Sequence, residues 1–177
     1  MNRLWLFLPL VLAITLGGVL YFGLGQDPSK LDSALVGESV PQFQLSLLQA
    51  PEQKVGPEVF SGRVQLLNIW GTWCPACRVE HAQLNKLAKQ GVPIVGLNYK
   101  DERPAALEWL EQRGNPYLTV IYDPEGSLGF DLGVYGAPET YLIDAEGIVR
   151  HRHVGIVDQE VWESDFKPLY EEYRNDS

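Results

Sequence analysis

Cys74 and Cys77 are the two cysteines of the 177-residue chain, and two residues separate them in the stretch GTWCPACRVEH at 71–81. Such a pair can serve as a structural crosslink, as half of a metal site, or as a reversible redox centre. A crosslink that closes a loop of about four residues would stabilise the fold by only about 2 kcal/mol, against almost 5 kcal/mol for a loop of about 100 residues. The spacing therefore favours a disulfide that opens and closes.

A zinc site would need two further ligands beside the two thiolates. His151 and His153 are the candidates, because alternate residues of a strand point to the same face. Histidines on a strand surface explain this pattern without a metal. We therefore predict no metal and no cofactor, only a redox-active disulfide between Cys74 and Cys77.

The residues around the pair indicate how it would react. Residues 64–70 form an apolar run of strand length, and the apolar residues of 75–90 have helical spacing, so Cys74 lies at the first turn of a helix. Pro75 suits the first helical position, because its missing N–H would have no partner there. The free N–H groups and the helix dipole favour a thiolate at Cys74. Cys77 lies one turn deeper on the same face, so we expect Cys74 to attack and Cys77 to resolve the mixed disulfide.

The hydrophobic patterning predicts an α/β domain. Residues 92–97 form a second buried strand, and the strand–helix–strand order from residue 64 onward argues for a parallel βαβ unit. Residues 139–143 and 148–154, joined by DAEG, predict an antiparallel hairpin. The remaining elements predicted from periodicity are a strand at 42–48 with edge-strand residues Val55 and Val59 after it, a helix at 103–112, a strand at 118–122, a short helix at 127–133 and a C-terminal helix from Val161 to Tyr173 that Pro168 kinks or divides.

The N-terminus predicts a membrane anchor. Residues 4–25 contain no charged side chain, and about 22 residues are enough to cross about 30 Å of hydrocarbon. Arg3 precedes the run, so the positive-inside bias places residue 1 in the cytoplasm and the rest of the chain outside. A cleaved signal peptide is the alternative, although its apolar core usually has only about 7–15 residues. Both alternatives place the domain in a compartment that oxidises thiols.

The charge of the chain excludes one class of partner. The formal net charge is −9 at pH 7, and the lysines and arginines are dispersed along the sequence. Binding to nucleic acid needs clustered basic residues that contact phosphates. We therefore expect no nucleic-acid partner.

The motif segments also resemble those of a known family. WCPAC after a strand resembles the active site of the thioredoxin superfamily, whose members carry a cis-proline that faces the disulfide. Pro138 in GVYGAPET occupies the matching place, so we expect the Ala137–Pro138 bond to be cis; the alternative is an ordinary loop proline, since only about 5–6% of such bonds are cis. The segments GTWCPACRVEH, GVYGAPETYLID and VWESDFKPLYEEY together resemble the CcmG/DsbE family, which is membrane-anchored and acts in bacterial cytochrome c maturation.

This resemblance implies a thioredoxin-like fold with an N-terminal β extension and a central helix–strand insert at 99–122. It also implies three parts: a transmembrane anchor at 1–25, a linker at 26–41 and a periplasmic domain at 42–177. The protein would be a protein-disulfide reductase, held at the bacterial inner membrane. It would take electrons from a DsbD-type donor and pass them to a CcmH-type partner or to the CxxCH thiols of apocytochrome c, which must be reduced for haem attachment.

Four residues complete the expected surroundings of the disulfide: Trp73, Pro75, Glu80 and Glu139. Trp73 is expected to cover the site rather than to react. Glu80 lies three residues beyond Cys77, and Glu139 directly follows the expected cis-proline. The two glutamates are either solvated surface carboxylates or, as the acidic active site of the family implies, negative charges that oppose the Cys74 thiolate.

Two other functions remain open at this point. One is a related anchored reductase of the TlpA or ResA kind, which serves other clients. The other is a docking module that binds cytochrome-maturation proteins and whose disulfide is incidental. A peroxidase fits less well, because the sequence contains a Cys-x-x-Cys pair rather than a lone cysteine.

Overall fold

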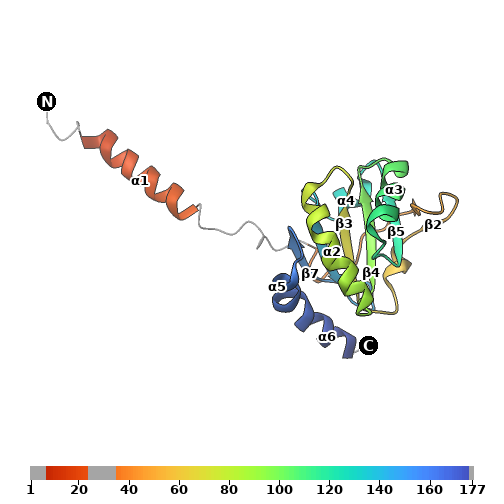
Figure 1. Cartoon of the computed structure of the whole chain (residues 1–177). Helices are drawn as coiled ribbons and strands as arrows, with labels where there is room; N and C mark the ends of the chain where they lie inside the picture. Colours follow the sequence, from red (N-terminus) through yellow and green to blue (C-terminus); the bar gives the residue numbers. More distant parts are fainter. Residues whose placement is uncertain (1–6, 24–34, 176–177) are drawn as a thin grey trace. The chain divides into compact units, whose positions relative to one another are not determined.

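The computed structural model describes residues 7–23 and 35–175 (Figure 1). These residues belong to two compact units, Met1–Leu31 and Asp32–Ser177. The first unit contains α1 (Leu8–Gly23), and the second contains every other element. No helix of the described ranges is long and apolar enough to cross a membrane. The predicted anchor at 1–25 and the predicted linker at 26–41 include residues outside those ranges.

A five-stranded mixed sheet lies at the centre of the second unit, in the order β5-β4-β3-β6-β7. Strands β3, β4 and β5 are parallel, β6 is antiparallel to β3, and β7 is antiparallel to β6. The βαβ unit and the hairpin predicted from the sequence are thus confirmed, with each strand end within two residues of its expected place. The strands are β3 (Gln65–Trp70), β4 (Ile94–Tyr99), β5 (Thr119–Asp123), β6 (Glu139–Ile143) and β7 (Val149–Val154).

Helices cover both faces of this sheet, and each face has its own apolar cluster (Figure 1). Alternate residues of β3 point to opposite faces, so Leu66 packs in one cluster and Leu67 in the other. The first face is covered by α2 (Pro75–Lys89), α3 (Arg103–Arg113) and the C-terminal helical segments, and the second by η3 (Pro57–Phe60) and α4 (Ser127–Asp131). Because both faces are covered, every residue of β3, β4 and β6 is buried.

The C-terminal helix accommodates its proline with a wider turn. Three segments follow each other without a break: α5 (Gln159–Val161), the π-helical η4 (Trp162–Phe166) and α6 (Lys167–Asn175). The Lys167 N–H bonds to the Trp162 carbonyl five residues back. Pro168 has no N–H and its ring would clash with the carbonyl four residues back, so a π turn directly before it relieves the conflict. The expected interruption is therefore a change of helix type rather than a division.

The N-terminal β extension is smaller than the sequence predicts. It consists of β1 (Leu45–Ser46) paired with β2 (Lys54–Val55), and Val59 lies in the helical turn η3 instead of an edge strand. The carbonyls of Leu47 and Leu48 accept hydrogen bonds from the Arg103 guanidinium, and the Leu48 N–H bonds to Val120. The carbonyls of Leu47 and Leu48 and the Leu48 N–H are thus bonded to the central insert rather than to β2.

Candidate active site

The disulfide lies where β3 ends and α2 begins. Cys74 is the N-cap of α2 and Pro75 is its first helical residue, as predicted. Cys74 and Cys77 are joined by a disulfide, with their Cα atoms 5.4 Å apart. The Cys77 N–H donates to Cys74 Sγ at 3.0 Å. The helix therefore presents an N–H group and the positive end of its dipole to the sulfur of Cys74.

Exposure does not distinguish the two cysteines, because Cys74 is 2% and Cys77 1% exposed. Their surroundings do. Cys74 Sγ lies 3.3 Å from the carbonyl oxygen of Ala137, and the Ala137–Pro138 bond is cis, as expected. Both cysteines belong to the apolar cluster under α2, but among the described contacts it is Cys74 that meets the cis-proline loop. A client that reaches the disulfide beside Pro138 therefore meets Cys74.

The turn before Cys74 is fixed by an aspartate. The Asp101 carboxylate accepts hydrogen bonds from the Thr72 N–H at 2.7 Å and from the Thr72 hydroxyl at 2.6 Å. The Trp73 indole N–H donates to the Tyr99 carbonyl at 3.0 Å, while its side chain is 49% exposed. The indole of Trp73 is thus anchored by a hydrogen bond directly before Cys74, while about half of the side chain is exposed.

Glu80 is buried one turn behind Cys77, on the same side of α2, with 1% exposure. Its Oε1 accepts a hydrogen bond from Asn68 Nδ2 at 2.9 Å, and its Oε2 accepts one from the Val157 N–H at 3.0 Å. Burial raises the pKa of Glu80 from its ordinary 4.5 to about 7, although both hydrogen bonds oppose the increase. A carboxyl group that titrates near neutral pH can both accept and return a proton.

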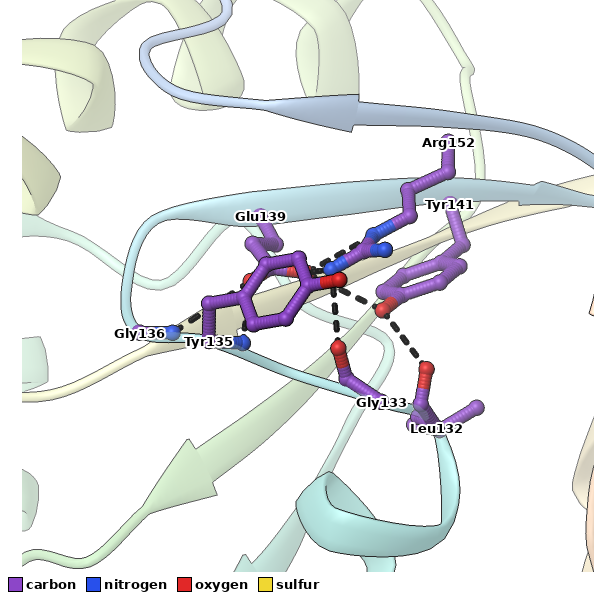
Figure 2. Close-up of polar contacts among 7 residues, drawn as sticks. All are labelled: Leu132, Gly133, Tyr135, Gly136, Glu139, Tyr141 and Arg152. Carbon is purple, nitrogen blue, oxygen red and sulfur yellow. Dashed lines mark hydrogen bonds and ion pairs between the residues drawn. The ribbon is translucent and has the colours of Figure 1, made fainter. Parts of the chain in front are cut away.

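Glu139 is equally buried but lies in a different environment. Arg152 Nη2 lies 2.7 Å from its Oε2, with 4% and 1% of the two side chains exposed. The N–H groups of Tyr135 and Gly136 and the Tyr141 hydroxyl also donate to the Glu139 carboxylate (Figure 2). Its negative charge is therefore matched by a cation and three neutral donors.

The network around Glu139 holds the loop that ends in the cis-proline (Figure 2). Arg152 Nη2 also donates to the Gly133 carbonyl at 2.9 Å, and the Tyr141 hydroxyl lies 3.2 Å from the Leu132 carbonyl. Backbone groups on both sides of Tyr135 are thus tied to the ion pair. The ion pair consequently fixes the segment that faces Cys74.

The structure separates the two glutamates that the sequence treated alike. Neither is a solvated surface carboxylate, so that interpretation was wrong for both, because each finds hydrogen-bond donors inside the domain. Glu80 has only neutral partners among its described contacts, whereas Glu139 pairs with Arg152. Of the two, Glu80 is the one buried without a cation among its described contacts.

Sequence reasoning missed three residues of the site: Asn68, Asp101 and Arg152. Each leaves a signal in the sequence. Asn68 is a polar residue inside the apolar run VQLLNIW, Asp101 follows the end of β4, and Arg152 lies between two histidines in β7. A buried strand position must satisfy a polar side chain locally, so such residues point to a network in the fold.

The histidines considered as metal ligands pack against an aromatic ring. His151 and His153 lie with their ring centroids 5.1 Å and 6.2 Å from that of Phe166. In the part of the chain that the structure describes, no group of three or more His, Cys, Asp or Glu side chains is placed to hold a metal.

Comparison with known proteins identifies the family. The Redoxin family model matches residues 35–169. The thiol:disulfide interchange protein DsbE of Vibrio cholerae is 53% identical, covering 97% of this chain and 96% of that protein. The proteins of the same description from Pseudomonas aeruginosa and Escherichia coli K12 are 52% and 47% identical, covering 97% and 100% of this chain and 96% and 99% of their own length. The chain belongs to the DsbE group of the Redoxin family.

Solved structures agree with this assignment. A protein from Chlorobium tepidum assigned as DsbE is 28% identical, with a TM-score of 0.61 over 79% of this chain and 97% of that one. A secreted thiol-disulfide isomerase from Corynebacterium glutamicum has a TM-score of 0.66 over 82% and 96% of the two chains; at 23% identity it shows the fold alone. The fold of this DsbE-family chain is thioredoxin-like, and its Cys74–Cys77 pair is that of a thiol:disulfide oxidoreductase.

Glu80 should make the stability of the oxidised protein depend on pH. Its pKa of about 7 in the folded state exceeds the ordinary 4.5, so between these pH values the folded chain binds more protons than the unfolded chain. The contribution of Glu80 to the free energy of unfolding therefore falls as the pH rises through this window. The change amounts to about 3 kcal/mol.

Glu80→Gln should remove this dependence. Relative to the unmodified chain, the variant should gain about 3 kcal/mol between pH 4.5 and pH 7 in urea unfolding of the oxidised proteins. Glu111→Gln, which removes an exposed carboxylate of α3, controls for the loss of a charge. Parallel pH profiles for the unmodified chain and Glu80→Gln would contradict the burial of an ionisable Glu80.

Arg152→Leu should destabilise the protein by about 3–5 kcal/mol, because it leaves the buried Glu139 carboxylate without its cation. Lys167→Met is the matched control, since the Lys167–Glu163 pair is exposed and joins residues four apart on a helix. Because water screens this exposed pair, its loss should leave the free energy of unfolding nearly unchanged. Urea unfolding at pH 7 measures both. Similar small losses in the two variants would show that the Glu139–Arg152 pair does not hold the loop.

Proposed function

We propose that this chain is a membrane-anchored periplasmic reductant in c-type cytochrome biogenesis. The observation that carries the proposal is the Cys74–Cys77 disulfide at the start of α2, beside Pro138 and in front of Glu80. The full-length similarity to DsbE proteins supports it. In this proposal the apolar residues 4–25 anchor the chain in the inner membrane, and the domain lies in the periplasm.

The geometry supports a two-step reduction of a client disulfide. In the first step the Cys74 thiolate attacks one client sulfur, the client disulfide breaks, and the other client sulfur leaves as a thiolate that takes a proton from water. In the second step the Cys77 thiol gives its proton to the Glu80 carboxylate and attacks Cys74 Sγ. The mixed disulfide breaks, the client leaves as a thiolate that is protonated in turn, and the Cys74–Cys77 disulfide closes. Two electrons have passed to the client.

The reverse reaction reloads the protein. A donor thiolate attacks Cys74, Cys77 leaves and takes its proton from Glu80, and a second donor thiol releases the donor as a disulfide. In the proposed pathway the donor is a DsbD-type protein. The acceptor is a CcmH-type partner or the CxxCH segment of apocytochrome c, whose two thiols must be reduced before haem is attached. A reversible pair suits this position, because the compartment itself oxidises thiols.

The second candidate function is a TlpA- or ResA-like reductase with other clients, and the third is a docking module with an incidental disulfide. The buried, titrating Glu80 behind Cys77 argues against the docking module, since binding alone gives no reason to bury a carboxylate beside a disulfide. The identity of the trapped partners separates the two reductases.

Cys77→Ser should accumulate mixed disulfides through Cys74, because the attacking thiolate remains and the resolving thiol is gone. Cys74→Ser should trap almost nothing. The measurement is non-reducing electrophoresis of each variant expressed as the full chain, followed by mass spectrometry of the attached proteins. Cytochrome-maturation proteins among them support the proposal, and other clients support the second candidate. Equal trapping by both variants would refute the assigned roles, and reducible adducts in neither would favour a docking module.

The reduction potential should lie near the thioredoxin value of about −270 mV rather than near the DsbA value of about −120 mV. The Glu80 charge opposes formation of a thiolate next to it and thereby destabilises the reduced form. Glu80→Gln should make the potential less negative, and about 30 mV corresponds to 1.4 kcal/mol for this two-electron couple. Equilibration with glutathione buffers measures both proteins. A value near −120 mV for the unmodified chain would refute the reductase assignment.

A further inference from the structure

The buried amide of Asn68 connects Glu80 to a tyrosine on the far side of the cluster. Asn68 Nδ2 donates to Glu80 Oε1 at 2.9 Å and to the Thr140 hydroxyl at 3.0 Å. Asn68 Oδ1 accepts a hydrogen bond from the Tyr117 hydroxyl at 2.8 Å. Asn68, Thr140 and Glu80 are at most 1% exposed and Tyr117 is 6% exposed. The redox function assigned above makes no use of Tyr117 or Thr140.

The side-chain amide can in principle take two orientations, related by a half-turn. In the observed one, an N–H group faces Glu80. In the reversed one, Asn68 Oδ1 would face the carboxylate oxygen, an arrangement that only a protonated Glu80 tolerates. The orientation of Asn68 and the protonation of Glu80 are therefore coupled.

Tyr117 distinguishes the two orientations. The Thr140 hydroxyl can either accept or donate, so it is satisfied in both. The Tyr117 hydroxyl has Asn68 Oδ1 as its acceptor; with the amide reversed, its hydrogen would be buried without one. The ring cannot move away, because it stacks on Trp70 with centroids 5.6 Å apart, and a Cβ on Gly96 would lie 3.0 Å from it.

We propose that Tyr117 is a positioning residue of the thiol-exchange reaction: its hydroxyl holds the Asn68 amide with an N–H toward Glu80 and so keeps that carboxylate able to take the proton of Cys77. The proposal rests on the redox function assigned to the Cys74–Cys77 pair. Among the described contacts the Tyr117 hydroxyl bonds to Asn68, and in this role it acts through that amide.

The titratable groups around Glu80 are consistent with this role. Burial, and then the charge of Glu80, raise the pKa of Tyr117 well above its ordinary value, so its hydroxyl always carries a proton to donate. The side chain of the adjacent His81 lies with Nε2 2.8 Å from the Gly114 carbonyl oxygen. Burial lowers the pKa of His81 below its ordinary 6.5, so the imidazole is neutral above pH 6.5. No charged group is among the causes of the Glu80 shift, and Cys77 lies one turn before Glu80 on α2. The change in charge thus belongs to Glu80 and the thiol.

The test is the pH dependence of mixed-disulfide resolution. The reduced chain is mixed with one equivalent of 5,5′-dithiobis(2-nitrobenzoate), and the second release of thionitrobenzoate, which reports the attack of Cys77 on Cys74, is followed from pH 5 to pH 9. Tyr117→Phe should move the inflection upward by about half to one pH unit, making resolution about three- to tenfold slower at pH 6 and unchanged at pH 9. Tyr122→Phe is the control, because it removes a tyrosine hydroxyl that bonds only to the Asp101 carbonyl among its described contacts.

Two further variants make the outcome decisive. In an Asn68→Ala background, Tyr117→Phe should have no additional effect on the profile, since Tyr117 acts through that amide. Thr140→Val removes a hydrogen-bond acceptor of the Asn68 amide but keeps the hydrogen bond that Tyr117 donates to Asn68 Oδ1. It should therefore shift the profile less than Tyr117→Phe. It is also the variant to measure if Tyr117→Phe does not fold. Tyr117→Phe with a lowered unfolding midpoint and an unmoved inflection would overturn the proposal, as would a full effect in the Asn68→Ala background.

Failure of the function and failure of this inference give different results. If Glu80→Gln leaves the inflection in place, Glu80 is not the proton acceptor and the assigned mechanism is wrong. If Glu80→Gln removes the inflection while Tyr117→Phe does not move it, the mechanism stands and only the positioning role of Tyr117 is refuted.

Discussion

The structure of the site depends on a carboxyl group that is buried without a cation among its described contacts. Glu80 is placed behind the disulfide by helix α2 and receives only neutral hydrogen bonds, from Asn68 and Val157. Such a group is costly to ionise, and the cost appears as a pKa of about 7. The same burial that makes Glu80 unfavourable as a structural residue makes it useful for moving a proton at neutral pH.

Glu139 shows the opposite solution to the same cost. Its carboxylate is as deeply buried, but Arg152 and three neutral donors compensate for the loss of water. A buried ion pair of this kind is weak evidence for stability and is often retained to fix one arrangement of the chain. Here the arrangement is the loop that carries Pro138 to Cys74. One glutamate is thus held in an ion pair, and the other is the proton acceptor of the proposed mechanism.

The order of the strands brings these parts together. β3 leads into Cys74 and carries Asn68, β6 begins directly after Pro138 and carries Thr140, and the two strands are neighbours in register, with Asn68 opposite Thr140. The disulfide, the cis-proline and the polar residues Asn68 and Thr140 therefore all lie along the β3–β6 pair of the sheet. From the central insert, Tyr117 donates a hydrogen bond to Asn68, and Asp101 accepts one from Thr72 in the turn before Cys74. Segments far apart in sequence meet because the sheet aligns their ends.

The amino-acid sequence was enough to predict the redox pair, its place at a helix N-terminus, the βαβ unit with its hairpin, and the cis-proline expected from family resemblance. These features depend on local chemistry: a spacing, a capping position and the periodicity of apolar residues. Which glutamate lacks a cation among its described contacts, and which hydrogen bonds Asn68, Arg152 and Tyr117 make, became visible only in the folded domain. Burial and the choice of hydrogen-bond partner are properties of the packed interior, so two glutamates that look alike in the sequence differ according to what the fold places beside them.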